Sequence, residues 1–298
     1  MRGMVVIATT EGLRVPGSPD VTALEGRSVS ALAASSDGLW AVVDGRAIWS
    51  GRDGDWHDVA HVGESALQCL LPTDAGVLAG TANAHLVRLA DGVVETLEGF
   101  EGAPGRRQWF TPWGGPPAVR SMAAGADGEV YANVHVGGIL RSDDDGASWR
   151  PTIDIRTDVH QVITVPGRPG LVLAAAAVGL ATSEDGGGSW SVARDGLAAS
   201  YCRALAVCGD TVLLTASEGP RGRRVAVYRR RLDADGPFEK CTAGLPEWFD
   251  RNIDTGCLVA TDDLAAFGTD DGRVFVSRDA GATWATAASG LPRILALA

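Results

Sequence analysis

Arginines stand at or near the entries to five short apolar segments that read as β-strands. They are Arg27, Arg120, Arg203, Arg251 and Arg293. A guanidinium group offers parallel N–H donors that hold a carboxylate or a phosphate through two hydrogen bonds. If these strand entries meet, the arginines predict an anion-recognising pocket with carboxylates on the neighbouring loops. Ordinary ion pairing between the same groups is the competing interpretation, and the sequence does not separate the two.

Side chains that could transfer protons or act as nucleophiles are few, and they fall on the same kind of loop or strand entry. The candidates for a catalytic role are Tyr201, Glu218, Asp44, His135 and His160. His135 and His160 could meet as an acid–base pair or as two metal ligands. No motif with metal-ligand, dinucleotide or phosphate-loop spacing is present, so the sequence predicts neither a bound metal nor a cofactor.

Large aromatic residues concentrate in an insertion at residues 100–119, which contains Trp109 and Trp113 between paired arginines and paired prolines. A long loop rich in aromatic residues is more often functional than a plain connection. We expect a lid whose tryptophans stack on a ligand, with Trp248 facing it, or a plug that packs on the fold. A surface for a protein partner is the remaining alternative.

Three copies of one eight-residue pattern, S-x-D-x-G-x-[ST]-W, indicate how these residues are positioned. We call these segments the octapeptide turns. Their pattern residues are Ser142, Asp144, Gly146 and Trp149; Ser183, Asp185, Gly187 and Trp190; and Ser277, Asp279, Gly281 and Trp284. The aspartate accepts hydrogen bonds from the turn backbone, the glycine takes a left-handed conformation, and the tryptophan anchors the turn. A structural role explains every position of the pattern.

The pattern resembles the Asp box, or BNR repeat, of sialidases and related β-propellers. The resemblance implies an all-β propeller in which each octapeptide turn joins the third and fourth strands of a blade. Short β-rich segments separated by turns recur along the chain at the spacing of propeller blades. We expect six four-stranded antiparallel blades at residues 28–61, 65–99, 120–153, 158–197, 201–245 and 252–292.

The two ends of the sequence predict a seventh blade. Residues 293–298 repeat the pattern of a first strand, and residues 3–24 read as the other three strands. Joining them in one blade pairs edges that would otherwise be exposed. The sequence therefore predicts a seven-bladed propeller that forms a single domain over residues 1–298, with the octapeptide turns on one face and the ligand site on the other. The placement of the site is an analogy with other propellers.

A sialidase-like activity is the alternative that the resemblance raises. It implies three arginines on the substrate carboxylate, a tyrosine nucleophile and an Arg-Ile-Pro segment, whereas this chain has Arg293-Ile294-Leu295 and only Tyr201 near the expected site. We therefore expect a non-catalytic propeller that binds a small anionic molecule, a glycan or a protein. A hydrolase or lyase acting on an anionic glycan or small carboxylate stays open as the second interpretation.

Composition restricts the partners further. The net charge of −11 argues against binding to nucleic acids or to anionic membranes, and no apolar run suggests a signal peptide or a membrane helix. A cytoplasmic protein is the default expectation. Five cysteines, an odd number without CxxC spacing, fall mostly in predicted strands, which favours buried reduced thiols.

Overall fold

The computed structural model describes residues 5–17, 22–52, 54–63, 65–112 and 114–298. Within these ranges almost all regular structure is short β-strand, and the helices are brief: α1 (Glu98–Glu101) and a 3₁₀ helix at Arg106–Gln108. No helix among the described residues has the length and apolar character needed to cross a bilayer.

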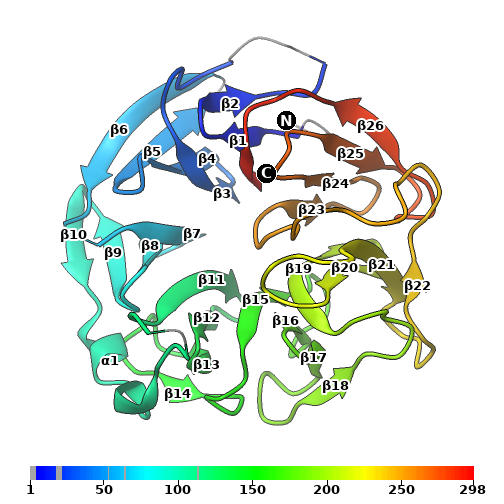
Figure 1. The fold of residues 1–298 in the computed structure, drawn as a ribbon. Helices are drawn as coiled ribbons and strands as arrows, with labels where there is room; N and C mark the ends of the chain where they lie inside the picture. Colours follow the sequence, from blue (N-terminus) through cyan, green and yellow to red (C-terminus); the bar gives the residue numbers. More distant parts are fainter. Residues whose placement is uncertain (1–4, 18–21, 53, 64, 113) are drawn as a thin grey trace. The chain divides into compact units, whose positions relative to one another are not determined.

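The strands form four-stranded sheets in which neighbours along the chain are also neighbours in the sheet (Figure 1). The first two sheets contain β3 (Val29–Ser35), β4 (Gly38–Val43), β5 (Ala47–Arg52) and β6 (Asp55–His61), then β7 (Leu67–Thr73), β8 (Gly76–Thr81), β9 (Leu86–Ala90) and β10 (Val93–Thr96). The third contains β11 (Ala118–Ala124), β12 (Val130–His135), β13 (Gly138–Ser142) and β14 (Arg150–Pro151). The register makes each an up-and-down antiparallel blade.

Three further sheets repeat this order. The fourth contains β15 (Val159–Thr164), β16 (Val172–Ala176), β17 (Gly179–Ser183) and β18 (Ser191–Ala193). The fifth contains β19 (Tyr201–Cys208), β20 (Thr211–Ser217), β21 (Ala226–Arg231) and β22 (Glu239–Lys240). The sixth contains β23 (Leu258–Ala260), β24 (Ala265–Gly268), β25 (Val274–Ser277) and β26 (Ala285–Ala288).

A seventh sheet joins the two ends of the chain. Its order is β2 (Gly12–Arg14), β1 (Ile7–Thr9) and β27 (Ile294–Leu297), and a bridge between Leu13 and Ala23 extends it. β1 pairs antiparallel with β27, with Ile7 opposite Leu297. The fold is therefore a seven-bladed β-propeller with one blade drawn from both termini, as the sequence predicted.

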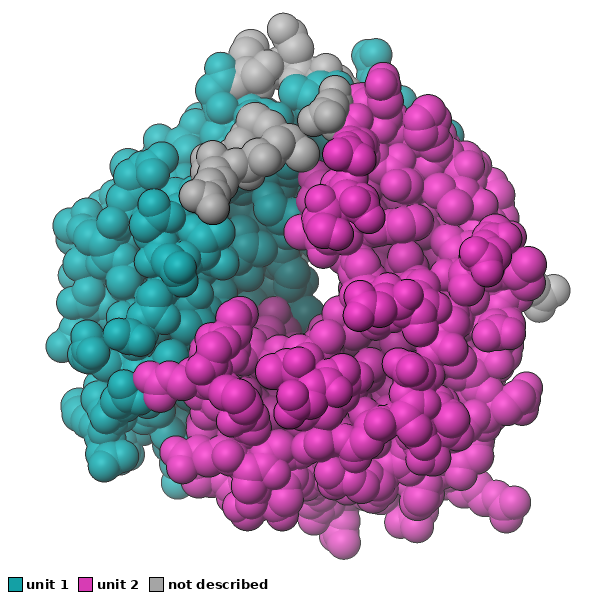
Figure 2. Space-filling view, turned by 180° about the vertical axis from the view of Figure 1, so that it is seen from behind, with its two compact units in different colours: residues 1–30, 175–180, 192–298 teal, residues 31–174, 181–191 magenta. Residues whose placement is uncertain are grey.

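The described contacts divide the chain into two compact units, shown in different colours in Figure 2. One comprises residues 1–30, 175–180 and 192–298, and the other comprises residues 31–174 and 181–191. In the first unit the core contains an aromatic cluster. Phe267 stacks on Phe275 at 5.0 Å between ring centroids and meets Trp284 edge-on at 4.8 Å, while Phe249 contacts both phenylalanines.

The second unit has a core of aliphatic side chains from successive blades, joined by aromatic residues of the insertion. Leu78, Leu86 and Leu140 are fully buried there. Phe100 of α1 is fully buried against Trp149, with their rings edge-on and 5.2 Å apart. The last residue of an octapeptide turn therefore anchors the start of the insertion as well as its own turn.

Each octapeptide turn lies between the third and fourth strands of its blade, as predicted, and supplies its own hydrogen-bond partners. In the first, the Asp144 carboxylate accepts from the Ser148 backbone N–H at 2.8 Å and from the Ser148 hydroxyl at 2.6 Å. The Gly146 N–H donates to Ser142 Oγ at 2.8 Å, and Trp149 Nε1 donates to the Gly146 carbonyl. The other two turns repeat the serine and aspartate bonds.

The glycine of the pattern is required by both backbone conformation and space. Gly281 has a φ of +80°, and a Cβ added there would lie 2.6 Å from Leu213 Cδ2.

The tryptophans of the pattern differ in burial. Trp284 is buried, whereas Trp190 is only partly buried and donates instead to the Thr152 carbonyl at 2.9 Å. Two of the three tryptophans, Trp149 and Trp284, are thus core residues, and Trp190 links neighbouring blades.

The five cysteines are buried and free, as expected from the sequence. Burial raises the pKa of Cys69 to about 12 and that of Cys241 to about 11, so both thiols are neutral near pH 7. These cysteines act as small apolar core residues.

Hydrogen bonds within the turns lower the pKa of their aspartates. Bonds from the Ser189 backbone and side chain and from Ser183 bring the pKa of Asp185 to about 2, and bonds from Thr283 and Ser277 do the same for Asp279. An aspartate with a lowered folded-state pKa stabilises the fold fully above its ordinary pKa of about 3.9, and the contribution is lost as the pH falls toward about 2.

We predict that Asp185→Asn combined with Asp279→Asn lowers the urea midpoint of unfolding near pH 7. We also predict that the urea midpoint of this variant falls less than that of the native chain as the pH is lowered from about 5 to about 2. The amide offers one acceptor where the carboxylate offers two, and it does not titrate in this range. Asp37→Asn combined with Asp127→Asn, at exposed turn positions of other blades, is the matched control. An acid decline that is as steep in the turn variant as in the native chain would contradict the prediction.

Candidate functional site

A histidine–aspartate–histidine cluster lies in the second unit, where β12 ends and β15 begins. His135 Nε2 is 2.7 Å from Asp158 Oδ1, and His160 Nε2 is 3.4 Å from the same oxygen. The two imidazole rings are 5.3 Å apart and tilted by 38°. The side chains of His135 and His160 are 3% and 0% exposed, whereas that of Asp158 is 25% exposed. Solvent therefore reaches part of the Asp158 side chain, whereas its Oδ1, on which the histidines converge, is buried.

Hydrogen bonds between β11, β12 and β15 fix the backbone around this cluster. The Asn133 amide donates to the carbonyl of Val159 at 3.0 Å, and the Val162 N–H donates to Ser121 Oγ at 2.9 Å. Both bonds join β15 to the preceding blade. Asn133 is fully buried, and its Oδ1 has no hydrogen-bond partner among the described residues.

The surroundings of Asp158 keep its carboxyl group ionised. Burial alone would raise its pKa, but the hydrogen bond to His135 and the charges of His160, His135 and Arg120 together lower it below the ordinary value. The cluster thus presents one carboxylate oxygen between two imidazole nitrogens, with the arginine charge nearby. Such a group can bind a cation or hold a proton.

Two of the predicted arginines meet in the first unit at one carboxylate. Arg251 Nε is 3.3 Å from Asp270 Oδ2, and Arg293 Nε contacts Asp270 Oδ1. Asp270 follows β24, and Arg293 precedes β27. Each oxygen of Asp270 therefore lies beside the Nε of a different arginine.

A third predicted arginine forms a separate pair. Arg203 Nε, in β19, is 2.6 Å from Asp254 Oδ1, and its guanidinium lies over the ring of Tyr201 at 5.9 Å. Cys257 is close to both pairs, because Asp254, Arg293 and Asp270 all act electrostatically on its thiol. Burial is the largest cause that brings the pKa of Cys257 to about 12, so the thiol adds no charge there.

The other sequence candidates are distributed over different contacts. Glu218 pairs with Arg224 at 3.4 Å. Trp248 lies against two cations, with the Arg224 guanidinium 4.5 Å and Lys240 Nζ 3.3 Å from its ring centroid. Asp44 is exposed in the turn between β4 and β5, and Arg27 is partly buried before β3. Trp113 lies outside the described residues.

Sequence reasoning missed three residues that these clusters depend on, namely Asp158, Asp254 and Asn133. Asp158 stands two positions before His160, a spacing that places both side chains on one side of an extended chain. This two-residue spacing was the signal in the sequence that could have identified Asp158. Nothing local marks Asp254, since its partner Arg203 belongs to another blade.

The insertion is a packed element rather than an open lid at Trp109. The Trp109 ring is buried 5.5 Å from Phe100, and the Arg106 guanidinium covers it at 5.0 Å. Arg106 is held in turn by Glu101 at 2.7 Å and by the carbonyl of Ala84. The expectation that Trp109 stacks on a ligand is therefore wrong, because the core already occupies its faces. Its position fits the alternative of a plug.

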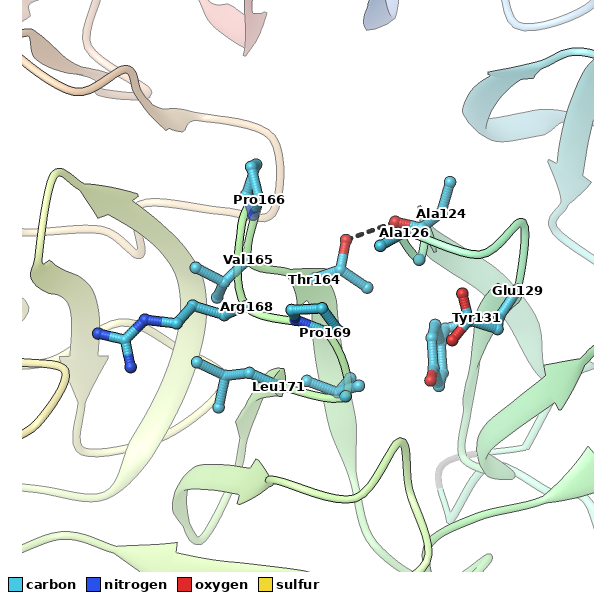
Figure 3. A pocket seen from close by; sticks show the side chains of 13 residues that line it. Ala124, Ala126, Glu129, Tyr131, Thr164, Val165, Pro166, Arg168, Pro169 and Leu171 are labelled. Carbon is cyan, nitrogen blue, oxygen red and sulfur yellow. Dashed lines mark hydrogen bonds between the residues drawn. The ribbon is translucent and has the colours of Figure 1, made fainter.

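Figure 3 shows a pocket of about 240 Å³ between the turns β11–β12 and β15–β16. Its polar groups are engaged within the protein: Glu129 accepts from the Asp127 N–H, and the Tyr131 hydroxyl donates to the Gly186 carbonyl. Burial raises the pKa of Tyr131, so the phenol is not activated as a nucleophile. The pocket lies at the same blade ends as the octapeptide turns. The Glu129 and Tyr131 groups that line it bond within the protein and do not form a catalytic group.

Comparison with known proteins establishes the fold and no family. No protein-family profile matches the chain, and no curated protein has detectable sequence similarity. The similarity of the octapeptide turns to the Asp box therefore remains a resemblance of local sequence and geometry.

Solved structures with the same architecture are numerous but distant in sequence. An ancestral GH74 enzyme superposes with a TM-score of 0.65 at 13% identity, over 95% of this chain and 39% of that one. The GH74 enzyme of Niastella koreensis gives 0.61 at 12% identity, over 96% and 47%. The WD40 domain of Neurospora crassa Pan2 gives 0.57 at 12% identity, over 87% and 78%. The chain spans less than half of either GH74 enzyme, and the propeller is what all of them share.

We predict that Trp109→Ala lowers the free energy of unfolding by about 3–5 kcal/mol, the usual cost of removing a large aromatic side chain from a core. The exposed neighbour Phe110 is the matched control, and Phe110→Ala should change stability by about 0.5 kcal/mol or less. Urea unfolding of both variants measures the difference. Equal and small effects at the two positions would contradict the assignment of Trp109 to the core.

Proposed function

We propose that this protein is a non-catalytic binding propeller that holds a small anionic ligand, a carboxylate or a phosphate ester, on Arg251 and Arg293. The observation that carries the proposal is the shared carboxylate of Asp270, whose two oxygens are bound by the Nε atoms of the two arginines. This contact places the two guanidinium groups beside one carboxylate, and both arginine side chains are exposed to an incoming ligand.

Exposure supports a role in recognition. The side chains of Arg251 and Arg293 are 76% and 59% exposed, whereas Asp270 between them is 23% exposed. Two guanidinium charges against one carboxylate leave net positive charge on a chain that is otherwise acidic. An anion with two oxygens can accept from the Nη groups without displacing Asp270.

The neighbouring Arg203–Asp254 pair extends the same site. Arg203 also contacts its aspartate through Nε, and Cys257 lies within the electrostatic reach of Asp254, Asp270 and Arg293. Three arginines accompanied by two aspartates favour a ligand with one or two negative charges. The net charge of −11 disfavours a polyanion such as nucleic acid and an anionic lipid surface. A small acid or a glycan bearing a carboxylate fits this balance best.

Binding is favoured over hydrolysis by the carboxyl groups themselves. A glycosidase needs an acid whose pKa is raised enough to stay protonated near neutral pH. The pKa values of Asp144, Asp158, Asp185, Asp271 and Asp279 are all shifted downward. These shifts support ionised partners for cations and for backbone N–H groups.

The test is calorimetric titration with succinate and with inorganic phosphate, on the native chain and on Arg251→Gln combined with Arg293→Gln. We predict saturable binding that weakens at least tenfold in the variant, since each charged hydrogen bond lost costs about 1.5–3 kcal/mol. Arg229→Gln combined with Arg231→Gln removes the same charge from β21 and should leave binding within about twofold. Absence of saturable binding by the native chain, or equal loss in both variants, would overturn the proposal.

A further inference from the structure

We infer that His135, Asp158 and His160 form a binding site for one divalent transition-metal ion of the zinc class. The carrying observation is the convergence of two imidazole nitrogens on a single carboxylate oxygen, at 2.7 and 3.4 Å. Their potential ligand atoms all lie within 4.8 Å of one another. The residues are distinct from those of the proposed anion site, so this inference does not depend on that proposal.

The distances suit a single ion after a small adjustment. Zinc binds imidazole nitrogen and carboxylate oxygen at about 2.0–2.2 Å, so two of its ligand atoms lie at most about 4.4 Å apart. The separations of 2.7 and 3.4 Å lie below that limit, and the 4.8 Å that encloses all the potential ligand atoms exceeds it by a few tenths of an ångström. Side-chain torsions alone can make this change, because the carboxylate is partly exposed and able to move.

The donor set selects the kind of metal. Two neutral imidazoles with one carboxylate suit zinc, cobalt(II) and iron(II), whereas calcium and magnesium require predominantly oxygen ligands. Three protein ligands leave at least one coordination position for water or an anion.

The surrounding residues provide the support that a metal site needs. Asn133 is buried on the same strand as His135, two positions earlier, and its amide is bonded to the residue between Asp158 and His160. Its Oδ1 has no hydrogen-bond partner among the described residues, so it can accept from an imidazole N–H or from a metal-bound water. Arg120, by contrast, weakens metal binding, because its own positive charge beside Asp158 repels a metal cation. We therefore expect reversible binding of moderate strength.

The chain contains a matched control for its own histidines. His61 Nε2 lies 2.7 Å from Asp58 on the exposed strand β6, which also carries His57. That group shares the histidine–aspartate distance of the buried cluster, but its His61 side chain is 68% exposed.

The experiment is calorimetric titration of zinc chloride into metal-free protein without a purification tag, with cobalt(II) absorption as a second readout. We expect one zinc per chain and a cobalt spectrum of low coordination number. His135→Gln combined with His160→Gln should weaken binding at least tenfold, and His57→Gln combined with His61→Gln should not change it.

Circular dichroism checks that each variant is folded, and Asp158→Asn provides a second disruption at the partly exposed ligand. Loss of the site in Asp158→Asn supports the inference even if the double histidine variant does not fold. The inference is overturned if the native chain binds no stoichiometric zinc, or if folded Asp158→Asn binds as the native chain does. Equal loss in the His57 and His61 variant would also overturn it.

Discussion

A chain that runs up and down through four antiparallel strands turns at one end after its first and third strands and at the other end after its second. This alternation determines where charged groups gather in the present fold. The octapeptide turns follow third strands, and their serine and aspartate side chains satisfy their own backbone N–H groups. His135 is the last residue of a second strand and Asp270 follows another, so both lie at the opposite ends of their blades from the turns that follow third strands. In the three blades with an octapeptide turn, one end is thus occupied by a self-contained turn, and the other end is available for polar residues.

The two polar clusters differ in how strongly water screens them. Arg251 and Arg293 project into solvent, so their interaction with any anion depends on bidentate geometry and weakens as salt is added. His135 and His160 are buried, so their charges and hydrogen bonds act in a medium of lower polarity and respond less to salt. In such a buried cluster, a charged group that lacks a partner destabilises the fold strongly. The burial of both histidines beside a carboxylate is the reason to attribute chemistry to this cluster.

The sequence allowed the fold to be predicted because the evidence for it is local. Each octapeptide turn identifies itself by four residues within eight positions, and strand spacing then gives the blades. The candidate site was only partly predictable. His135 and His160 could be named from their places at strand ends, but Asp158 and Asp254 depend on which residue of the next blade lies opposite. Trp109 was misassigned because its burial depends on Phe100 and Arg106, and neither contact is visible in the composition of the loop.

The pairing of β1 with β27 makes assembly of this protein depend on its order of synthesis. Ile7 and Leu297 are partners in one sheet although almost the entire chain separates them. Contacts between such distant residues carry the largest loop-closure entropy and form late in folding. On the ribosome, β1 must therefore wait with an unpaired edge until residues near Ile294 emerge. Until then this edge of β1 is open to mispairing with strands of other chains.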